Sequence, residues 1–289
     1  MQLSYANGIR SLSHLYSLSC FRDIINQDDL SQVGGRIKKY KKTVLGFDKT
    51  MSFDKFLELL YKEMMKNYRN EYIFKNAIIN ERLLQKYGLK TTILLNEFKI
   101  GNSIADIILV NGEVRLFEIK TDLDNLNRLD RQLSDYQKAI GKIYIVTDSK
   151  NLCEINKRYS LTRFGIIELD NFGYLRQQKE ALNDESFFEH RTIFKMLRKE
   201  EYLSIIKEKY KTLPDVPNTK IFKESLKLIE RLDVVSFQKM AFSRIKNRMP
   251  SLSKILDKPA PDELKLLCYV LGFNEEHYEK LFKLLKRRI

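Results

Sequence analysis

The sequence predicts an α/β protein in which a mixed sheet is flanked by helical segments on both sides. Three observations predict this class. Short apolar runs typical of strands occur between residues 93 and 178, whereas the outer segments show the three-to-four-residue apolar spacing of helices. Gly101-Asn102 and Asn111-Gly112 are tight-turn signals that join consecutive strands into antiparallel hairpins. A helical stretch then separates two strands, as a crossover in a mixed sheet requires.

The first 66 residues are expected to be a helical and irregular region. Apolar residues recur at helical spacing from Phe53 to Met64, and Ser52 is the expected N-cap of that helix. The basic run 36–42 lies between Gly34-Gly35 and Gly46, so we interpret it as a loop. Such a run either contacts phosphates or is simply solvated, and its pattern favours neither.

Residues 67–180 are expected to form the α/β core. An amphipathic helix at 71–87 is stopped by Gly88, and Asp124 is the expected cap of a helix that reaches about Ile140. The apolar and alternating runs predict strands at 93–98, 104–110, 114–120, 143–147, 164–169 and 174–178.

Residues 186–289 are expected to be a helical C-terminal domain. Two proline-containing stretches, 213–217 and 259–261, interrupt its helices. We expect these helices to be the surface for a protein partner or for self-association, if the protein has either.

Composition narrows the class of partner. The 289 residues carry a formal net charge of +14, which favours a polyanion such as nucleic acid. Cys20, Cys153 and Cys268 lie far apart, so they predict neither a disulfide framework nor a zinc site. No apolar stretch approaches the length of a membrane span. A cytoplasmic protein without a membrane segment is therefore expected.

Acidic residues interrupt two of the predicted strands. Asp106 lies within the apolar run 104–110, and Glu118 and Lys120 end the next strand, two residues apart and hence on one face. If the hairpin turn centres on Gly101-Asn102, Glu97 lies opposite Asp106; if the turn is shifted by one residue, Glu97 is a solvated edge acid. Like charges so close favour a bound cation, and oxygen ligands suit Mg²⁺ or Mn²⁺.

The ordered set of motifs resembles that of the PD-(D/E)XK nuclease superfamily. Asp106 matches the acid of the second strand, and Glu118-x-Lys120 matches the pair of the third. Gln132 and Tyr136 resemble the Q-x-x-x-Y motif of the branch with RecB nuclease domains and lambda-type exonucleases. The run 116–124 is similar to a bacterial group of nuclease-like proteins of unsettled function. The resemblance covers roughly residues 70–150.

The resemblance implies a restriction-endonuclease-like core with the element order αβββαβ. It implies that Asp106, Glu118 and Glu97, with the Ile119 carbonyl, hold the metal, while Lys120 orients or deprotonates the attacking water. It also implies catalytic roles for Gln132 and Tyr136, and for a glutamate on the helix before the first strand. Glu71 fits the spacing for that glutamate, and Glu81 is the alternative.

These features predict a Mg²⁺-dependent nuclease that hydrolyses DNA, in DNA processing or phage defence. The alternative is a catalytically silent nucleic-acid-binding protein on a nuclease fold. A defence or toxin effector is a third possibility, by analogy of fold alone. The sequence has no G-x-x-x-x-G-K-[ST] loop, and His14, His190 and His277 are isolated, which disfavours a P-loop motor and a histidine metal site.

Overall fold

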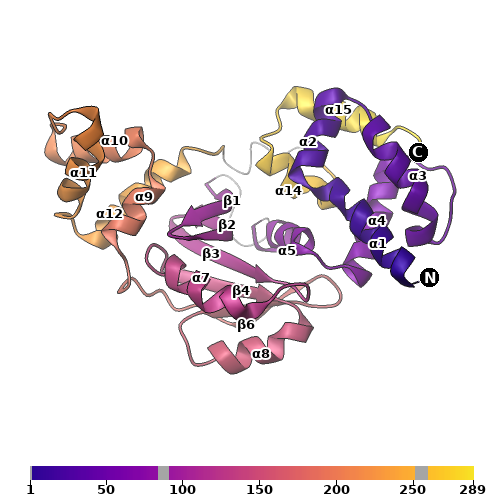
Figure 1. The fold of residues 1–289 in the computed structure, drawn as a ribbon, viewed down its shortest axis with the longest axis horizontal. Helices are drawn as coiled ribbons and strands as arrows, with labels where there is room; N and C mark the ends of the chain where they lie inside the picture. The colour runs from indigo at the N-terminus through magenta and orange to yellow at the C-terminus, as the bar shows by residue number, and fades with distance from the viewer. Residues whose placement is uncertain (1, 84–90, 251–259) are drawn as a thin grey trace.

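The computed structural model describes residues 2–83, 91–250 and 260–289. A central sheet lies between two helical groups, one of which contains both ends of the described chain (Figure 1). Gly88 and Pro259, which were expected to interrupt helices, lie outside the described residues.

The sheet has six strands in sequential order. Strands β3, β4 and β5 are parallel to one another, and the remaining neighbours are antiparallel. Each strand begins and ends within two residues of the predicted bounds, which confirms the mixed α/β class. The strands are β1 (Ile93–Ile100), β2 (Ser103–Asn111), β3 (Glu113–Lys120), β4 (Lys142–Thr147), β5 (Gly165–Leu169) and β6 (Leu175–Lys179).

The β1–β2 hairpin has the predicted register. Ile93 pairs with Val110 and Ile100 pairs with Ser103, so the turn centres on Gly101-Asn102. Gly101 has φ +60°, a left-handed conformation that glycine adopts without the steric cost of a side chain. This register brings Asp106 to the middle of β2, directly beside β3.

Two layers of helix cover the sheet. The 3₁₀ turn η3 (Leu126–Arg128) and α7 (Leu129–Tyr136) connect β3 to β4 and share a core with Leu116 and Ile145. On the other face, α5 (Glu71–Ala77) and the π-helix η2 (Ile78–Leu83) share a core with Phe117. Alternate strand positions therefore point into opposite cores, as the pleat requires.

Two local predictions in the core were wrong. Asp124 does not cap the crossover helix, because its carboxylate accepts hydrogen bonds from the Thr121 amide and hydroxyl; Asn125 caps η3 instead. The sequence reasoning also missed α8 (Ser149–Tyr159) between β4 and β5. Asp148 accepts hydrogen bonds from the first backbone amides of α8, and this capping residue was the signal that could have found it.

The N-terminal region is helical throughout most of its length. Its basic run 36–42 lies within α3 and is not a loop, contrary to prediction. Val33, Ile37 and Val44 recur on the buried face, and their packing outweighs the helix-breaking tendency of Gly34-Gly35. The elements are α1 (Gln2–Ser13), η1 (His14–Tyr16), α2 (Leu18–Gln27), α3 (Ser31–Leu45) and α4 (Phe53–Asn67).

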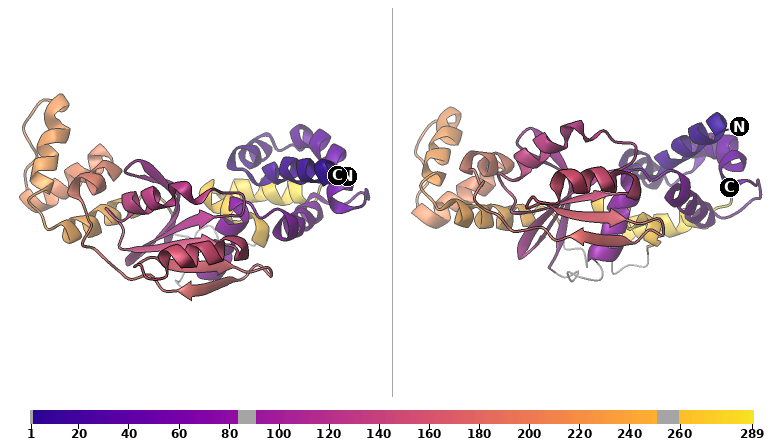
Figure 2. Two further views of the ribbon diagram at one scale, coloured as in Figure 1. Left: turned by 60° about the horizontal axis from the view of Figure 1, so that its bottom comes forward. Right: turned by 90° about the horizontal axis from the view of Figure 1, so that it is seen from below.

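The helices of the predicted 186–289 region fall into two separate groups (Figures 1 and 2). The first packs at the β1 edge of the sheet and shares the α7-side core. The second packs against the N-terminal helices. The first group is α9 (His190–Met196), α10 (Lys199–Tyr210), α11 (Asn218–Ile229) and α12 (Val234–Lys246); the second is η4 (Asp262–Leu264), α14 (Lys265–Val270) and α15 (Glu275–Leu285).

Backbone hydrogen bonds join residues 287–289 to residues 51–53 at the start of α4. Met51 and Ile289 exchange two of these bonds, and the Phe53 amide donates to the Arg287 carbonyl. Across residues 2–83, 91–250 and 260–289, no helix has the length and apolar character needed to cross a bilayer.

Candidate functional site

Asp106 lies between two fully buried apolar residues of β2. Ala105 and Ile107 are both 0% exposed, which fixes the strand around the carboxylate. The Ile119 amide of β3 donates a hydrogen bond to Asp106 Oδ2 at 2.7 Å. The neighbouring strand therefore orients the carboxylate at the end of β3 where Glu118 lies.

Glu118 and Lys120 lie on the same face of β3, as predicted. The Lys120 ammonium donates to Glu118 Oε1 at 2.6 Å, and Glu118 is only 1% exposed. The Tyr136 hydroxyl, from α7, lies 2.9 Å from Glu118 Oε2 and 2.7 Å from the Ile104 carbonyl oxygen. Two elements, β3 and α7, thus hold one buried carboxylate.

Gln132 precedes Tyr136 by one turn on α7, so both side chains face the same side of the helix. Gln132 Oε1 is buried and has no hydrogen-bond partner within the described chain. A buried amide oxygen without a partner is costly, so this atom is available to a donor from a bound ligand or water.

The two candidate helix glutamates lie in different places. Glu71 begins α5, and its carboxylate is close enough to Asp106 and Glu118 to influence the pKa of both. Glu81 instead accepts a hydrogen bond from the Leu175 amide of β6 at 2.9 Å. The structure therefore brings Glu71, and not Glu81, to the carboxylates, while the catalytic role of Glu71 stays a prediction.

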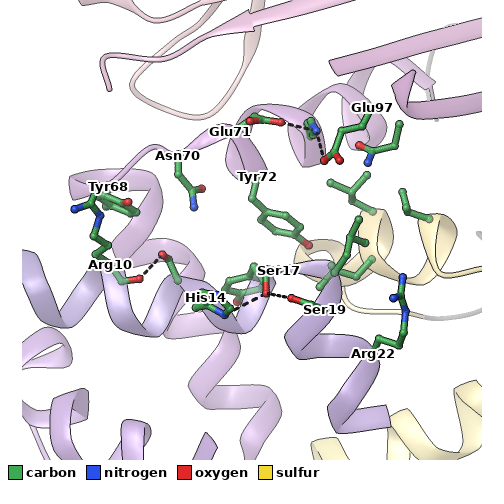
Figure 3. Close-up of a pocket in the computed structure, with 18 residues that line it drawn as sticks. Arg10, His14, Ser17, Ser19, Arg22, Tyr68, Asn70, Glu71, Tyr72 and Glu97 are labelled. Carbon is green, nitrogen blue, oxygen red and sulfur yellow. Dashed lines mark hydrogen bonds and ion pairs between the residues drawn. The ribbon is translucent and has the colours of Figure 1, made fainter. Parts of the chain in front are cut away.

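Lys75 is a charged residue at the site that the sequence reasoning missed. Its ammonium lies 2.5 Å from a Glu71 carboxylate oxygen and 3.2 Å from Glu97 Oε1, and its side chain is only 6% exposed. Figure 3 shows Glu71 and Glu97 turned toward one ammonium between them. The available signal was a lysine within the apolar run 72–79, because a buried lysine requires acidic partners.

Glu97 does not pair with Asp106. The prediction that a turn centred on Gly101-Asn102 places Glu97 opposite Asp106 is therefore wrong. Its neighbours Asn96 and Phe98 keep the predicted register, but Glu97 itself is left out of the ladder. Its backbone has φ +52°, a left-handed conformation that turns the side chain off the pleat. The carboxylate is 59% exposed and meets Lys75 instead.

The electrostatics of the cluster favour an added positive charge. Burial, together with the nearby Glu118 and Glu71 carboxylates, holds the pKa of Asp106 well above its usual range. Burial also raises the pKa of Glu118, although Lys120 opposes that shift. Burial alone would lower the pKa of Lys75, but Glu71 and Asp106 raise it above its usual value.

The donor set suits a hard divalent cation. Within the described residues, no three or more His, Cys, Asp or Glu side chains form a metal-binding group. Mg²⁺ keeps several waters and needs only one or two protein carboxylates, so the metal-binding role of Asp106, Glu118 and the Ile119 carbonyl stays a prediction. The raised pKa values of both carboxylates also fit a site that a cation would stabilise.

Comparison with known proteins identifies the family. The model of the family described as bacteriophage P4 protein cII matches residues 64–266, which is more than half of the chain. The chain belongs to this family. A curated relative, protein cII of Enterobacteria phage P4, is 30% identical over 116 residues. That match covers 39% of this chain and 40% of the length of the relative.

A solved structure with some similarity is that of Pyrococcus furiosus SfsA in complex with Ca²⁺. It is 12% identical, and the alignment covers 44% of this chain and 63% of that chain with a TM-score of 0.23. That TM-score is too low to establish a common fold.

Proposed function

We propose that this member of the P4 cII family is a metal-dependent nuclease that hydrolyses phosphodiester bonds in DNA. One observation carries the proposal: Asp106, Glu118, Lys120 and Tyr136, which come from β2, β3 and α7, meet around a buried, acidic point. The element order α5-β1-β2-β3-α7-β4 agrees with the αβββαβ core of the PD-(D/E)XK superfamily. The net charge of +14 agrees with a polyanionic substrate.

Each residue has a distinct part in the proposed reaction. Asp106, Glu118 and the Ile119 carbonyl would hold Mg²⁺ or Mn²⁺, which lowers the pKa of a bound water and neutralises charge on the phosphate. The Lys120 ammonium, held by Glu118, would supply a donor to the negative charge that develops on the phosphate. Burial and the neighbouring Glu118 raise the pKa of Tyr136, so its hydroxyl stays protonated and keeps Glu118 in place.

A second candidate function has one specific observation in its favour. Both Glu118 oxygens already have partners, Lys120 and Tyr136, and Lys75 lies between Glu71 and Glu97. Acids that already have partners within the protein agree with a nucleic-acid-binding protein that has no catalytic activity. The two candidates differ in what a divalent cation does to the protein.

The test is cleavage of single-stranded, duplex and branched DNA and of RNA, with Mg²⁺, Mn²⁺ or EDTA. We expect cleavage of DNA only with a divalent cation, and we expect Asp106→Asn and Glu118→Gln to reduce it to background. Glu154→Gln is the matched control, because Glu154 is an exposed acid on α8, and it should cut at the wild-type rate.

The same variants distinguish the two candidate functions. Removing one acid from a buried like-charge pair relieves repulsion, so the melting temperature of Asp106→Asn in EDTA should hold or rise. If the wild-type protein cuts none of the substrates and Asp106→Asn binds DNA unchanged, the silent binding protein is the correct reading. A large loss of stability in both acid variants would make these carboxylates structural.

A further inference from the structure

A cleft of about 650 Å³ opens beside the carboxylate cluster, between the N-terminal helices and the core. One wall contains Glu71 and Lys75 of α5 and Glu97 of β1. Because Glu71 and Lys75 also act on Asp106 electrostatically, this wall borders the proposed catalytic point. Residues of α14, such as Leu266 and Leu267, close one end of the cleft.

The opposite wall is basic and rich in hydroxyl groups. In Figure 3, the residues of this wall lie across the cleft from Glu71 and Glu97. They come from the end of α1, from η1 and from the start of α2, so three consecutive elements build the wall. The labelled members are Arg10, His14, Ser17, Ser19 and Arg22.

Arg10 and Arg22 are the two strong cations of this wall. Both are exposed, and neither forms an ion pair with another residue of the described ranges 2–83, 91–250 and 260–289. Elsewhere, Arg163 and Arg248 have carboxylate partners. Arginine presents a planar set of donors that matches phosphate, so two unpaired arginines on a cleft wall are suited to phosphate oxygens.

The size of the cleft limits what can enter it. A volume of about 650 Å³ lies in the range of sites for small ligands, which is roughly one or two nucleotides. A duplex, whose major groove alone is about 12 Å wide, is too large for such a space. Tyr68 also lines the cleft and is half-buried, and an aromatic ring of this kind can stack on an unpaired base.

We propose that this cleft holds a single nucleic-acid strand, with its backbone phosphates on Arg10 and Arg22 and its next phosphodiester at the carboxylates. This inference rests on the proposed nuclease function and names its substrate class as an unpaired strand or strand end. The N-terminal helices are then the substrate-binding part of the site, and Glu71 and Lys75 of α5 line the cleft where it borders the carboxylates.

The test measures binding of a fluorescein-labelled dT12 oligonucleotide by anisotropy in EDTA, where no cleavage occurs. The variant Arg10→Gln/Arg22→Gln should bind dT12 at least tenfold more weakly than wild type. The slope of log K against log salt should fall by about 1.4, because each phosphate contact on a single strand contributes about 0.7. Arg10→Lys/Arg22→Lys keeps the charge and should keep most of that slope.

Two further variants separate binding from folding and from general charge. Lys38→Gln/Lys42→Gln removes two exposed charges from α3 in the same helical group, and it should change the affinity much less. Ser19→Glu places a carboxylate on the cleft wall at the start of α2, where an acid favours the helix. It should therefore weaken dT12 binding without lowering the melting temperature.

Each outcome either supports or overturns the proposal that the cleft binds a single strand. Equal losses in the arginine and the α3 lysine variants would mean that binding depends on net charge and not on the cleft. Tighter binding of a 12-base-pair duplex than of dT12 would overturn the substrate class. If the arginine variants lose binding but wild type never cuts DNA, the nuclease proposal is wrong and the proposal that the cleft binds a single strand is supported. If wild type cuts and the arginine variants bind and cut normally, only the proposal that the cleft binds the strand is wrong.

Discussion

At the scale of single residues, the site depends on burying more negative charge than its lysines neutralise. Asp106 and Glu118 each have a raised pKa for which burial is the main cause. Lys75 and Lys120 reduce this cost without removing it. Such an arrangement destabilises the folded protein when both carboxylates are ionised, and an added cation relieves the strain.

A pH dependence of stability follows from these shifts. An acid whose pKa is higher in the folded than in the unfolded state binds its proton more tightly when folded. Its stabilising contribution is therefore complete below about pH 4, the unfolded value, and is lost as the pH rises through the folded pKa. In EDTA, the contribution of Asp106 to the free energy of unfolding should fall above about pH 4.

The variant Asp106→Asn isolates this effect, because an amide does not titrate. Urea unfolding at a series of pH values in EDTA should show that Asp106→Asn gains free energy of unfolding relative to wild type as the pH rises above about 4. Glu154→Gln should keep the wild-type profile. Profiles of equal slope for wild type and Asp106→Asn would mean that Asp106 titrates normally and that the cluster is not under electrostatic strain.

Sequence reasoning found most of the residues at the site because their order along the chain is informative. Asp106, Glu118 and Lys120 interrupt or end apolar strands, where a charge is conspicuous. Lys75 escaped notice because its partners are Glu71, one turn away, and Glu97, which reaches it only after the chain folds. The left-handed backbone of Glu97 is a property of one residue that alternation of side chains cannot reveal.

At the scale of elements, the hairpin of β1 and β2 is fastened to α7 by Asp135. Its buried carboxylate accepts hydrogen bonds from the Asn102 amide at 3.2 Å and from the Ser103 hydroxyl at 2.7 Å. Helix and hairpin approach so closely that a Cβ added to Gly101 would lie 3.0 Å from Asp135 Oδ1. The same helix carries Tyr136, so one contact fixes the hairpin and the phenol together.

Replacing Asp135 with alanine should therefore loosen the hairpin. Two donors would lose a buried acceptor, and the expected loss of stability is about 1–3 kcal/mol by chemical denaturation. Ser134→Ala, at an exposed position on the same helix, is the control and should change stability by less than about 0.5 kcal/mol. Similar values for the two variants would mean that Asp135 does not hold the turn.

The strands and α4, with Ser52 at its N-cap position, were predictable, whereas α3 was not, for a physical reason. A strand with one buried face shows an alternation of apolar and polar residues in the sequence. The two tight turns also fixed the register of the hairpins. Helix α3 depends on tertiary packing, since Gly34-Gly35 and five basic residues within 36–42 speak against a helix locally. The burial of Val33, Ile37 and Val44 in the folded protein stabilises this segment as a helix.

At the scale of the whole molecule, charge is distributed unevenly. Over residues 67–150, which contain the carboxylates, Lys and Arg outnumber Asp and Glu by only 13 to 11. Over residues 190–246, the α9–α12 group, the ratio is 14 to 7. Because this basic group lies at the far edge of the sheet from the N-terminal helices, it is suited to a more distant part of a polynucleotide (Figure 1).

Charge removal on α11 tests this distribution. Lys220 and Lys223 are exposed, and Lys220→Gln/Lys223→Gln should lower the slope of log K against log salt on long duplex DNA by about 0.9 per lost contact. Binding of dT12 should change much less, because its proposed site is the cleft between the N-terminal helices and the core. An unchanged slope on long DNA would favour a protein partner for the α9–α12 group.

The hydrogen bonds between residues 51–53 and 287–289 join two segments that the ribosome makes far apart in time. Helices α1–α4 are made well before α14 and α15, whose apolar side chains pack with theirs in one core. Until then, Phe21 and its neighbours lack the partners against which they pack. The cleft, which α14 closes at one end, therefore forms only after α14 has been made, so a chain that stops before α14 should bind dT12 more weakly.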